Sequence, residues 1–249
     1  MSRGMILGII VIFICIILIA SILQSSTGFG FSIMATPFLL MIFLPQEAIQ
    51  INIILSLIIS TILVWKIRND IDKVLLKRIS LGSMFGLPFG FIIFILSNIT
   101  VIKLVVSVLL LLLTLLLICK FKMRATPMRD FIVGGVSGAL TTSIGMPGPP
   151  LLLYFTGTDI KKEQLRATTL AFFLFIFSIS LLTQILFTGT SIIIWQSSLY
   201  AIPIVLIGLF IGQVIFKRIN QQIFRLFTYI LLICTGMLLL IESIKSLLH

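Results

Sequence analysis

Two stretches of the chain place hydroxyl side chains, glycines and prolines inside otherwise apolar segments. One reads Thr-Thr-Ser-Ile-Gly-Met-Pro-Gly-Pro-Pro at 141–150, and the other reads Gln-Ser-Ser-Thr-Gly-Phe-Gly at 24–30 and continues toward Pro37. Hydroxyls can satisfy the open carbonyls at a helix end, and glycine adopts the left-handed conformations that a tight reversal needs. Proline is favoured in the first turn of a helix. Each stretch therefore predicts a helix that ends, turns and starts again.

A helix that starts inside a membrane protein is a natural site for an anion, because it offers unpaired N–H groups and the positive end of its dipole. Arg166 could add a planar guanidinium that binds two oxygens of an oxyanion, although its place at a span boundary also fits a plain topology marker. Plain helix kinks are the simpler alternative to a binding site. The predicted substrate-binding residues are Gln24, Ser25, Ser26, Thr27, Gly28, Gly30, Asn52, Thr141, Thr142, Ser143, Gly145, Gly148, Arg166 and Thr168. The predicted structural helix breaks are Pro37, Pro147, Pro149 and Pro150.

The composition predicts that these segments fold in a lipid bilayer. Of the 249 residues, 59% are hydrophobic and 10% are charged, far from the balance of a soluble domain. A membrane-spanning helix needs about 20 apolar residues. Such runs occupy 5–24, 27–45, 48–65, 79–97, 104–119, 131–156 with its break, 167–188, 193–216 and 226–241. We therefore expect an all-α polytopic protein of the inner (cytoplasmic) membrane.

The net charge of +11 predicts topology rather than nucleic-acid binding, because the basic residues lie in short loops between spans. If 131–143 and 147–155 are two arms of a hairpin that enters and leaves on one side, the loops at 66–78, 120–129, 161–166 and 217–225 are all cytoplasmic. Only Arg3, Lys103 and Lys245 are then left outside. A single crossing gives a poorer separation of charge.

The two halves of the chain share matched positions, which predicts an internal repeat. The pairs are Ser26 with Ser143 and Gly28 with Gly145 at an offset of 117, and Gly86, Gly90, Asn98 and Lys103 with Gly208, Gly212, Asn220 and Arg225 at an offset of 122. We expect a first repeat at 1–119, a basic linker at 120–130 and a second repeat at 131–249. We expect each half to be a hairpin followed by three spans. Because three is an odd number of crossings, the second repeat enters the membrane from the opposite side to the first, so the two repeats are inverted. Because one chain holds both halves, a monomer suffices, and a homodimer is the alternative.

Several chemistries are disfavoured by what the spans lack. Their only acidic residues are Glu47 and Glu242 near the ends, and the only histidine is His249. An intramembrane enzyme, a cation carrier or a proton relay would want a titratable group at depth. The three cysteines are isolated in apolar runs and predict neither a metal site nor a disulfide, and no cofactor is expected. The Gly-x-x-x-Gly pairs at 86/90, 134/138 and 208/212 indicate helix packing.

The second stretch, Ile-Gly-Met-Pro-Gly-Pro-Pro-Leu-Leu-Leu-Tyr-Phe, followed by Lys-Lys-Glu-Gln-Leu-Arg-Ala-Thr-Thr, resembles the TauE/SafE sulfite exporter family. The resemblance implies transport of sulfite, sulfoacetate or another organosulfonate. The first stretch, Gly28-Phe-Gly30-Phe-Ser, has fewer glycines than the commoner form of the family. Another small anion, or uptake coupled to a cation, remains an alternative. Export is favoured because an inside-negative potential of about 100 mV expels each negative charge with about 2.3 kcal/mol.

Overall fold

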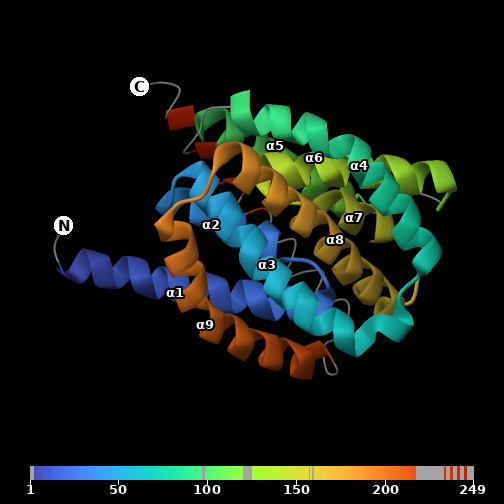
Figure 1. Cartoon of the computed structure of the whole chain (residues 1–249), viewed down its shortest axis with the longest axis horizontal. Coiled ribbons are helices and arrows are strands. Elements are labelled where there is room, and N and C mark those ends of the chain that lie inside the picture. Colours follow the sequence, from blue (N-terminus) through green and yellow to red (C-terminus); the bar gives the residue numbers. More distant parts are fainter. Residues whose placement is uncertain are drawn as a thin grey trace.

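The computed structural model describes residues 3–96, 99–119, 125–156, 158 and 160–216, with single positions between 233 and 245. Within these residues the chain is helical and contains no strand, which confirms the all-α class (Figure 1). The elements are α1 (Arg3–Thr27), α2 (Phe31–Ile42), α3 (Pro45–Ile67), the 3-10 turn η1 (Arg68–Asp70), α4 (Lys73–Leu96), α5 (Ile99–Ile118), α6 (Pro127–Ile144), α7 (Gly148–Thr156), α8 (Lys162–Thr188) and α9 (Ile192–Phe216). The predicted span at 226–241 lies outside the well-described residues.

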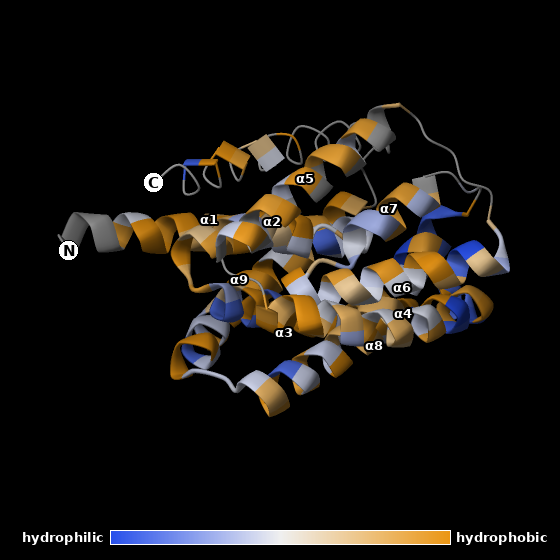
Figure 2. Cartoon of the chain, turned by 90° about the horizontal axis from the view of Figure 1, so that it is seen from above, coloured by the Kyte–Doolittle hydropathy of each residue, from blue (hydrophilic) through white to orange (hydrophobic). Residues whose placement is uncertain are grey.

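Within the part of the chain that the structure describes, five helical segments are long and apolar enough to cross a membrane, so the chain is a multi-pass membrane protein. They run over Leu7–Thr27, Pro45–Asp70, Lys73–Leu96, Lys162–Thr188 and Ile192–Phe216. Large apolar side chains such as Phe89 and Phe210 are exposed on the outside of these helices, as expected for residues that face lipid. Figure 2 shows hydrophobic residues along most of the helices.

Both predicted reversals are present. The first break, residues 28–30, separates α1 from α2, and the second break, residues 145–147, separates α6 from α7. Gly28, Gly30 and Gly145 have φ angles of 88°, 126° and 70°, which side-chain-bearing residues rarely adopt. Glycine is therefore required at both breaks because the backbone reverses through left-handed conformations.

The expectation that Pro37 breaks a helix is wrong. Pro37 is buried inside α2, which continues on both sides of it. The fixed φ of proline fits a helix, and the missing N–H of Pro37 costs α2 one backbone hydrogen bond. The chain reverses earlier, at Gly28 and Gly30. α2 has 12 residues and is therefore about 18 Å long, too short to cross the bilayer as the predicted 27–45 span would.

In the second half, α7 folds back along α6. The hydroxyl of Tyr154, near the end of α7, donates a hydrogen bond to Asp130, in the first turn of α6. Asp130 also pairs with Arg78 at the start of α4, at 3.1 Å. The start of α6 and the end of α7 therefore lie at the same end of the molecule, as expected for the two arms of a hairpin. The first arm begins at Pro127 rather than at 131.

We expect Tyr154→Phe to loosen this hairpin. The substitution removes one of the two groups that satisfy the buried carboxylate of Asp130, and such a loss costs about 1–3 kcal/mol. Unfolding of the purified protein in detergent should show a lower thermal midpoint. Tyr200→Phe is the control, because Tyr200 is exposed. Equal midpoints for the two variants would contradict the proposed role of this hydrogen bond.

Glycines let two pairs of helices pack with their backbones in close approach. A Cβ at Gly86 or Gly90 of α4 would overlap a backbone carbonyl of α6. A Cβ at Gly208 or Gly212 of α9 would lie 2.6 Å from atoms of α1. The Gly-x-x-x-Gly pairs therefore serve packing, as predicted, and α4 lies on α6 as α9 lies on α1 (Figure 1).

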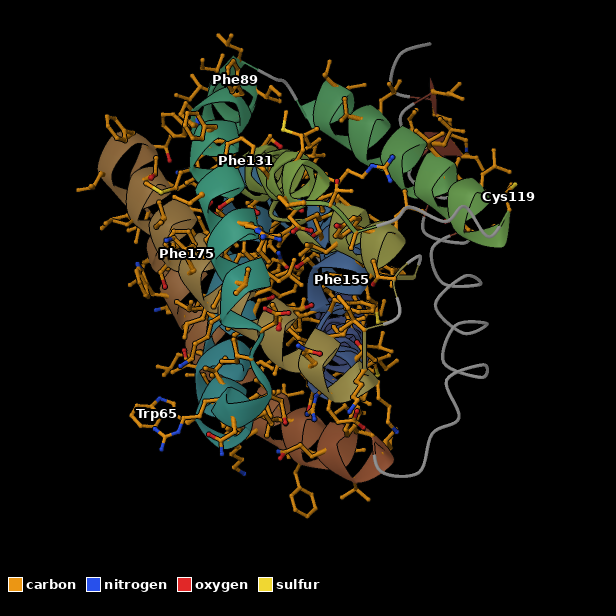
Figure 3. The ribbon with its side chains drawn as sticks, turned by 90° about the vertical axis from the view of Figure 1, so that its right-hand side faces the viewer. Trp65, Phe89, Cys119, Phe131, Phe155 and Phe175 are labelled. Atoms are coloured by element: carbon orange, nitrogen blue, oxygen red, sulfur yellow. The ribbon has the colours of Figure 1, made fainter. Side chains whose placement is uncertain are left out.

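The antiparallel helices α3 and α8 are joined at both ends. At one end, the backbone N–H of Asp72 donates to the Thr168 hydroxyl at 2.9 Å. At the other end, Gln50 Nε2 donates to the Gly189 carbonyl at 3.0 Å. The first end carries the basic loops and the starts of α4 and α6, and we call it the basic end. Trp65 lies there and points away from the helices (Figure 3).

Candidate functional site

Gly28 of the first break packs directly against Arg166. A Cβ at Gly28 would lie 3.0 Å from the Cα and carbonyl oxygen of Arg166, so a larger residue would be crowded there as well as strained by the positive φ. The Arg166 guanidinium donates from Nη2 to the Ser25 carbonyl at the end of α1 and lies 4.3 Å from the centre of the Phe216 ring. The structure therefore brings together Ser25, Gly28 and Arg166, three of the residues that the sequence predicted.

Arg166 is buried but has an unused donor. The residue is 6% exposed, and its Nε–H has no acceptor among the described residues. A buried charged donor without a partner is costly, so native proteins almost always supply one from protein, water or ligand. A guanidinium edge of this kind suits an oxyanion. Arg166 is therefore the strongest single candidate for contact with an anionic substrate.

The hydroxyls at the first break do not reach the last carbonyls of α1, contrary to the prediction, but donate back to a carbonyl about one turn earlier in the same helix. Ser26 Oγ donates to the Leu23 carbonyl at 3.1 Å, and Thr27 Oγ1 donates to the same carbonyl at 2.7 Å. The start of α2 is different, because Gly30 occupies its N-cap and provides no side-chain acceptor for the first N–H groups. The sequence thus leaves the donors at the start of α2 without a side-chain cap, a condition that suits an anion.

The second break is held by two amide side chains. Asn52 Nδ2 donates to the Gly145 carbonyl at 2.7 Å, and Gln184 Nε2 donates to the Thr142 carbonyl at 3.2 Å. Asn52 was predicted, whereas Gln184 was not, although a glutamine inside an apolar span is itself a signal. Two of the remaining predicted hydroxyls bond to carbonyls of their own helix, Thr141 to Ser137 and Ser143 to Ala139. The Thr142 hydroxyl is shared between Gly138 of its own helix and, at 3.0 Å, Leu87 of α4.

The two breaks differ in the donors that follow them. α7 begins with Gly148, Pro149 and Pro150, and the two prolines lack an N–H. This confirms the placement of the two prolines in the first turn of a new helix, with Pro147 in the break before it. The start of α7 nevertheless offers fewer backbone donors than the start of α2, where Phe31, Ser32 and Ile33 all have one. The first break is therefore the more suitable anion site.

Two separate sets of hydrogen bonds hold the two breaks on α3. Asn52, Ser56 and Ser60 are spaced four residues apart and lie on one face of α3. Gln24 Nε2 donates to the Ser56 carbonyl and to the Ser60 hydroxyl, both at 3.1 Å, while Asn52 binds Gly145. Both breaks are therefore fixed to the same buried polar face. Ser56 and Ser60 were not predicted.

Thr168 and one described cavity are not part of either break. The Thr168 hydroxyl accepts the hydrogen bond from Asp72 that joins α8 to the loop before α4, so its observed role is structural. A cavity of about 660 Å³ opens at the end opposite the basic end, between the start of α3 and the loop from α8 to α9. Glu47 and Ser191 line it, and their side chains are hydrogen bonded at 3.1 Å.

Comparison with known proteins agrees with this architecture. No curated protein and no solved structure is significantly similar to the chain. A family model described as "Sulfite exporter TauE/SafE" matches residues 12–239. The match includes both breaks and, except for the first residues of α1, every long apolar helix that the structure describes, and these helices fit a family of membrane exporters. The protein therefore belongs to the TauE/SafE sulfite exporter family.

Proposed function

We propose that the protein exports a sulfur-containing oxyanion, such as sulfite, sulfoacetate or another organosulfonate, across the inner membrane. The observation that carries this proposal is the buried Arg166, whose guanidinium has an unused Nε–H and whose backbone packs against Gly28, two residues before the uncapped N-cap of α2. The start of α7 contributes a second, weaker positive helix end. Gln24, Ser25, Ser26 and the hydroxyls around the second break complete the proposed polar surroundings of the anion.

The proposed mechanism is alternating access between two inverted repeats. Equivalent contacts support it: Gly28 packs on Arg166, and Gly145 packs on Ile49, which is related to Arg166 by the same offset of 117 that relates the two glycines. The packing of α4 on α6 also has a counterpart in the packing of α9 on α1. Two halves with equivalent interfaces can rock against each other around a fixed site. One chain supplies both breaks, so we take the monomer as the functional unit.

The basic end is proposed to face the cytoplasm. Lys73, Lys77 and Arg78 start α4, Arg129 starts α6, and Lys161 precedes α8, so the positive-inside rule gives all three loops the same side. The hydrogen bond from Tyr154 to Asp130 supports a hairpin that returns to this side.

Labelling of single cysteines tests this topology. We expect Asn69→Cys and Lys161→Cys to react with a membrane-impermeant thiol reagent from the cytoplasmic side, and Thr190→Cys from the other side. All three positions are exposed, and the three native cysteines must first be replaced by serine. Reaction of Asn69→Cys and Lys161→Cys from opposite sides would contradict the hairpin, because it would require 131–155 to cross once.

Export needs no proton relay in this account. Asp130 is the one buried acidic side chain among the described residues, and it is paired with Arg78. The membrane potential supplies about 2.3 kcal/mol per negative charge at 100 mV, or roughly a fifty-fold concentration ratio. The proposed carrier is therefore an electrogenic uniporter.

Exchange in liposomes tests the substrate class. Purified protein is reconstituted in vesicles that contain unlabelled sulfite, and entry of radiolabelled sulfite by counterflow is measured. We expect sulfoacetate or a simple alkylsulfonate to replace internal sulfite, and phosphate or nitrate to replace it poorly. Exchange of phosphate or nitrate alone would support the alternative of another small anion. Absence of any exchange, with folded protein, would refute the proposal.

A further inference from the structure

One face of α8 carries three buried residues in successive turns, Arg166, Thr169 and Phe173. Residues three and four positions apart lie on the same face of a helix. Arg166 packs against Gly28 of the first break. Phe173 is 1% exposed, and its Cζ atom would lie 3.7 Å from a Cβ at Gly148, the first residue of α7. Thr169 therefore lies between the contact of α8 with the first break and its contact with the start of α7.

The starts of α2 and α7 meet close to this face of α8. The Cδ1 atom of Ile33, in the first turn of α2, would lie 3.5 Å from the same Cβ at Gly148 that Phe173 approaches. Side chains of a helix lean toward its N-terminus, so the side chain of Thr169 covers the turn of α8 that precedes it and begins at Arg166. Thr169 is therefore flanked by Arg166 on one side and by the meeting point of the two helix starts on the other.

The hydroxyl of Thr169 has no hydrogen-bond partner among the residues that the structure describes, although Thr169 is fully buried. Threonines inside helices often donate to the carbonyl four residues earlier, as Thr141 and Thr183 do in this protein. Buried hydroxyls are usually satisfied by protein, water or a ligand. The free O–H of Thr169 lies one helical turn from Arg166, whose Nε–H is also free, so the two residues can serve one ligand.

The position equivalent to Thr169 in the other half of the chain supports this location. Thr169 and Asn52 are separated by 117 residues, the offset that also relates Gly145 to Gly28. Asn52 Nδ2 donates to the carbonyl of Gly145 in the second break at 2.7 Å. A polar side chain at this position therefore serves a break, and at Thr169 the donor is left for a ligand.

We propose that Thr169 is a substrate-binding residue, whose hydroxyl donates a hydrogen bond to one oxygen of the transported oxyanion. The inference rests on the proposed function and adds to it a neutral donor that acts beside the positive charge of Arg166. An oxyanion carries several acceptor oxygens and can therefore accept from both residues. Phe173, one turn further along α8, offers no polar group, so Thr169 is the last donor on this face before the apolar contact with Gly148.

Binding of sulfite to the purified protein in detergent tests the inference. The thermal midpoint of unfolding, followed by tryptophan fluorescence, is measured against sulfite concentration, with chloride at the same ionic strength as the reference. Valine has the shape of threonine without the hydroxyl, so we expect Thr169→Val to weaken sulfite binding about tenfold, which corresponds to about 1.4 kcal/mol. The midpoint without sulfite should not fall, because the hydroxyl has no protein partner to lose. A structural role would lower that midpoint and leave the affinity unchanged.

Thr183→Val is the matched control, because it makes the same substitution on the same helix at a hydroxyl that already donates to the Ile179 carbonyl. We expect it to leave the affinity for sulfite unchanged. If Thr169→Val does not fold, Thr169→Ser and Thr169→Ala replace it, since these variants differ from each other only in the hydroxyl, and the serine variant should bind sulfite more tightly.

The outcomes separate this inference from the proposed function. Absence of binding of sulfite and of ethanesulfonate to the wild-type protein would refute the proposed function and this inference with it. Sulfite binding that is equally tight in the wild type and in Thr169→Val, or in Thr169→Ser and Thr169→Ala, would overturn this inference alone.

Discussion

Replacing Arg166 by methionine should reduce transport of sulfite or an alkylsulfonate about 10- to 100-fold. Arg166 is the one buried cation among the side chains that the structure describes, and a hydrogen bond to a charged group is worth about 1.5–3 kcal/mol. Methionine keeps much of the length and apolar bulk of the arginine stem. Initial rates of counterflow in liposomes, normalised to reconstituted protein, measure the effect.

Lys162→Met is the matched control for this substitution. Lys162 lies one turn before Arg166 on the same face of α8 and also faces the Phe216 ring, but its side chain is 55% exposed and it pairs with Glu163. We expect its removal to change the rate less than twofold. Equal losses in the two variants would indicate that basic charge at this end, rather than a specific contact of Arg166, supports transport. Arg166→Lys should retain part of the rate, since it keeps the charge without the planar fork.

Gly134→Ala should destabilise the protein far more than Gly135→Ala. A Cβ at Gly134 would overlap the carbonyl oxygen of Ile79 on α4, whereas a Cβ at Gly135 would lie 3.4 Å from the Gly82 carbonyl oxygen, an ordinary contact. Overpacking of this kind costs about 3 kcal/mol, and here the clash is with backbone that cannot change rotamer. At Gly135 the better helix propensity of alanine, about 1 kcal/mol, should balance any crowding.

Thermal unfolding in detergent, with tryptophan fluorescence or circular dichroism as the signal, compares the two variants. The pair is well matched, because the residues are adjacent on one helix and the substitution is the same. Similar midpoints for both would contradict the close packing of α4 on α6. A lower midpoint for Gly135→Ala than for Gly134→Ala would mean that α4 packs against the face of α6 that carries Gly135, and not the face that carries Gly134.

The features that depend on local sequence were predicted well. Length and apolarity define the long helices, and hydroxyl, glycine and proline residues define both breaks, because the backbone chemistry of a reversal is local. The same reasoning failed at Pro37, since one proline in a helix can be tolerated when glycines nearby provide the turn. It also could not predict that α2 has only 12 residues.

Contacts between distant parts of the chain set the rest of the site. Nothing in the neighbourhood of Arg166 indicates that its guanidinium reaches the Ser25 carbonyl, 141 residues away, or that Phe216 stacks on it. Gln184 and its bond to Thr142 depend in the same way on the register of α8 against α6. The two breaks differ chemically because Arg166 contacts the first and Gln184 contacts the second. The matched motifs in the two halves give no sign of this difference.

Potential-driven release of sulfite from liposomes tests the central claim most directly. Vesicles containing the protein, sulfite and potassium are diluted into sodium-free buffer with little potassium, and valinomycin makes the interior negative. We expect release to accelerate with this potential, to slow when the gradient is reversed, and to be abolished by Ser143→Leu, which places a bulky side chain at the second break. Release at the same rate under both potentials, or release that survives in Ser143→Leu, would contradict an electrogenic oxyanion carrier that works through the breaks.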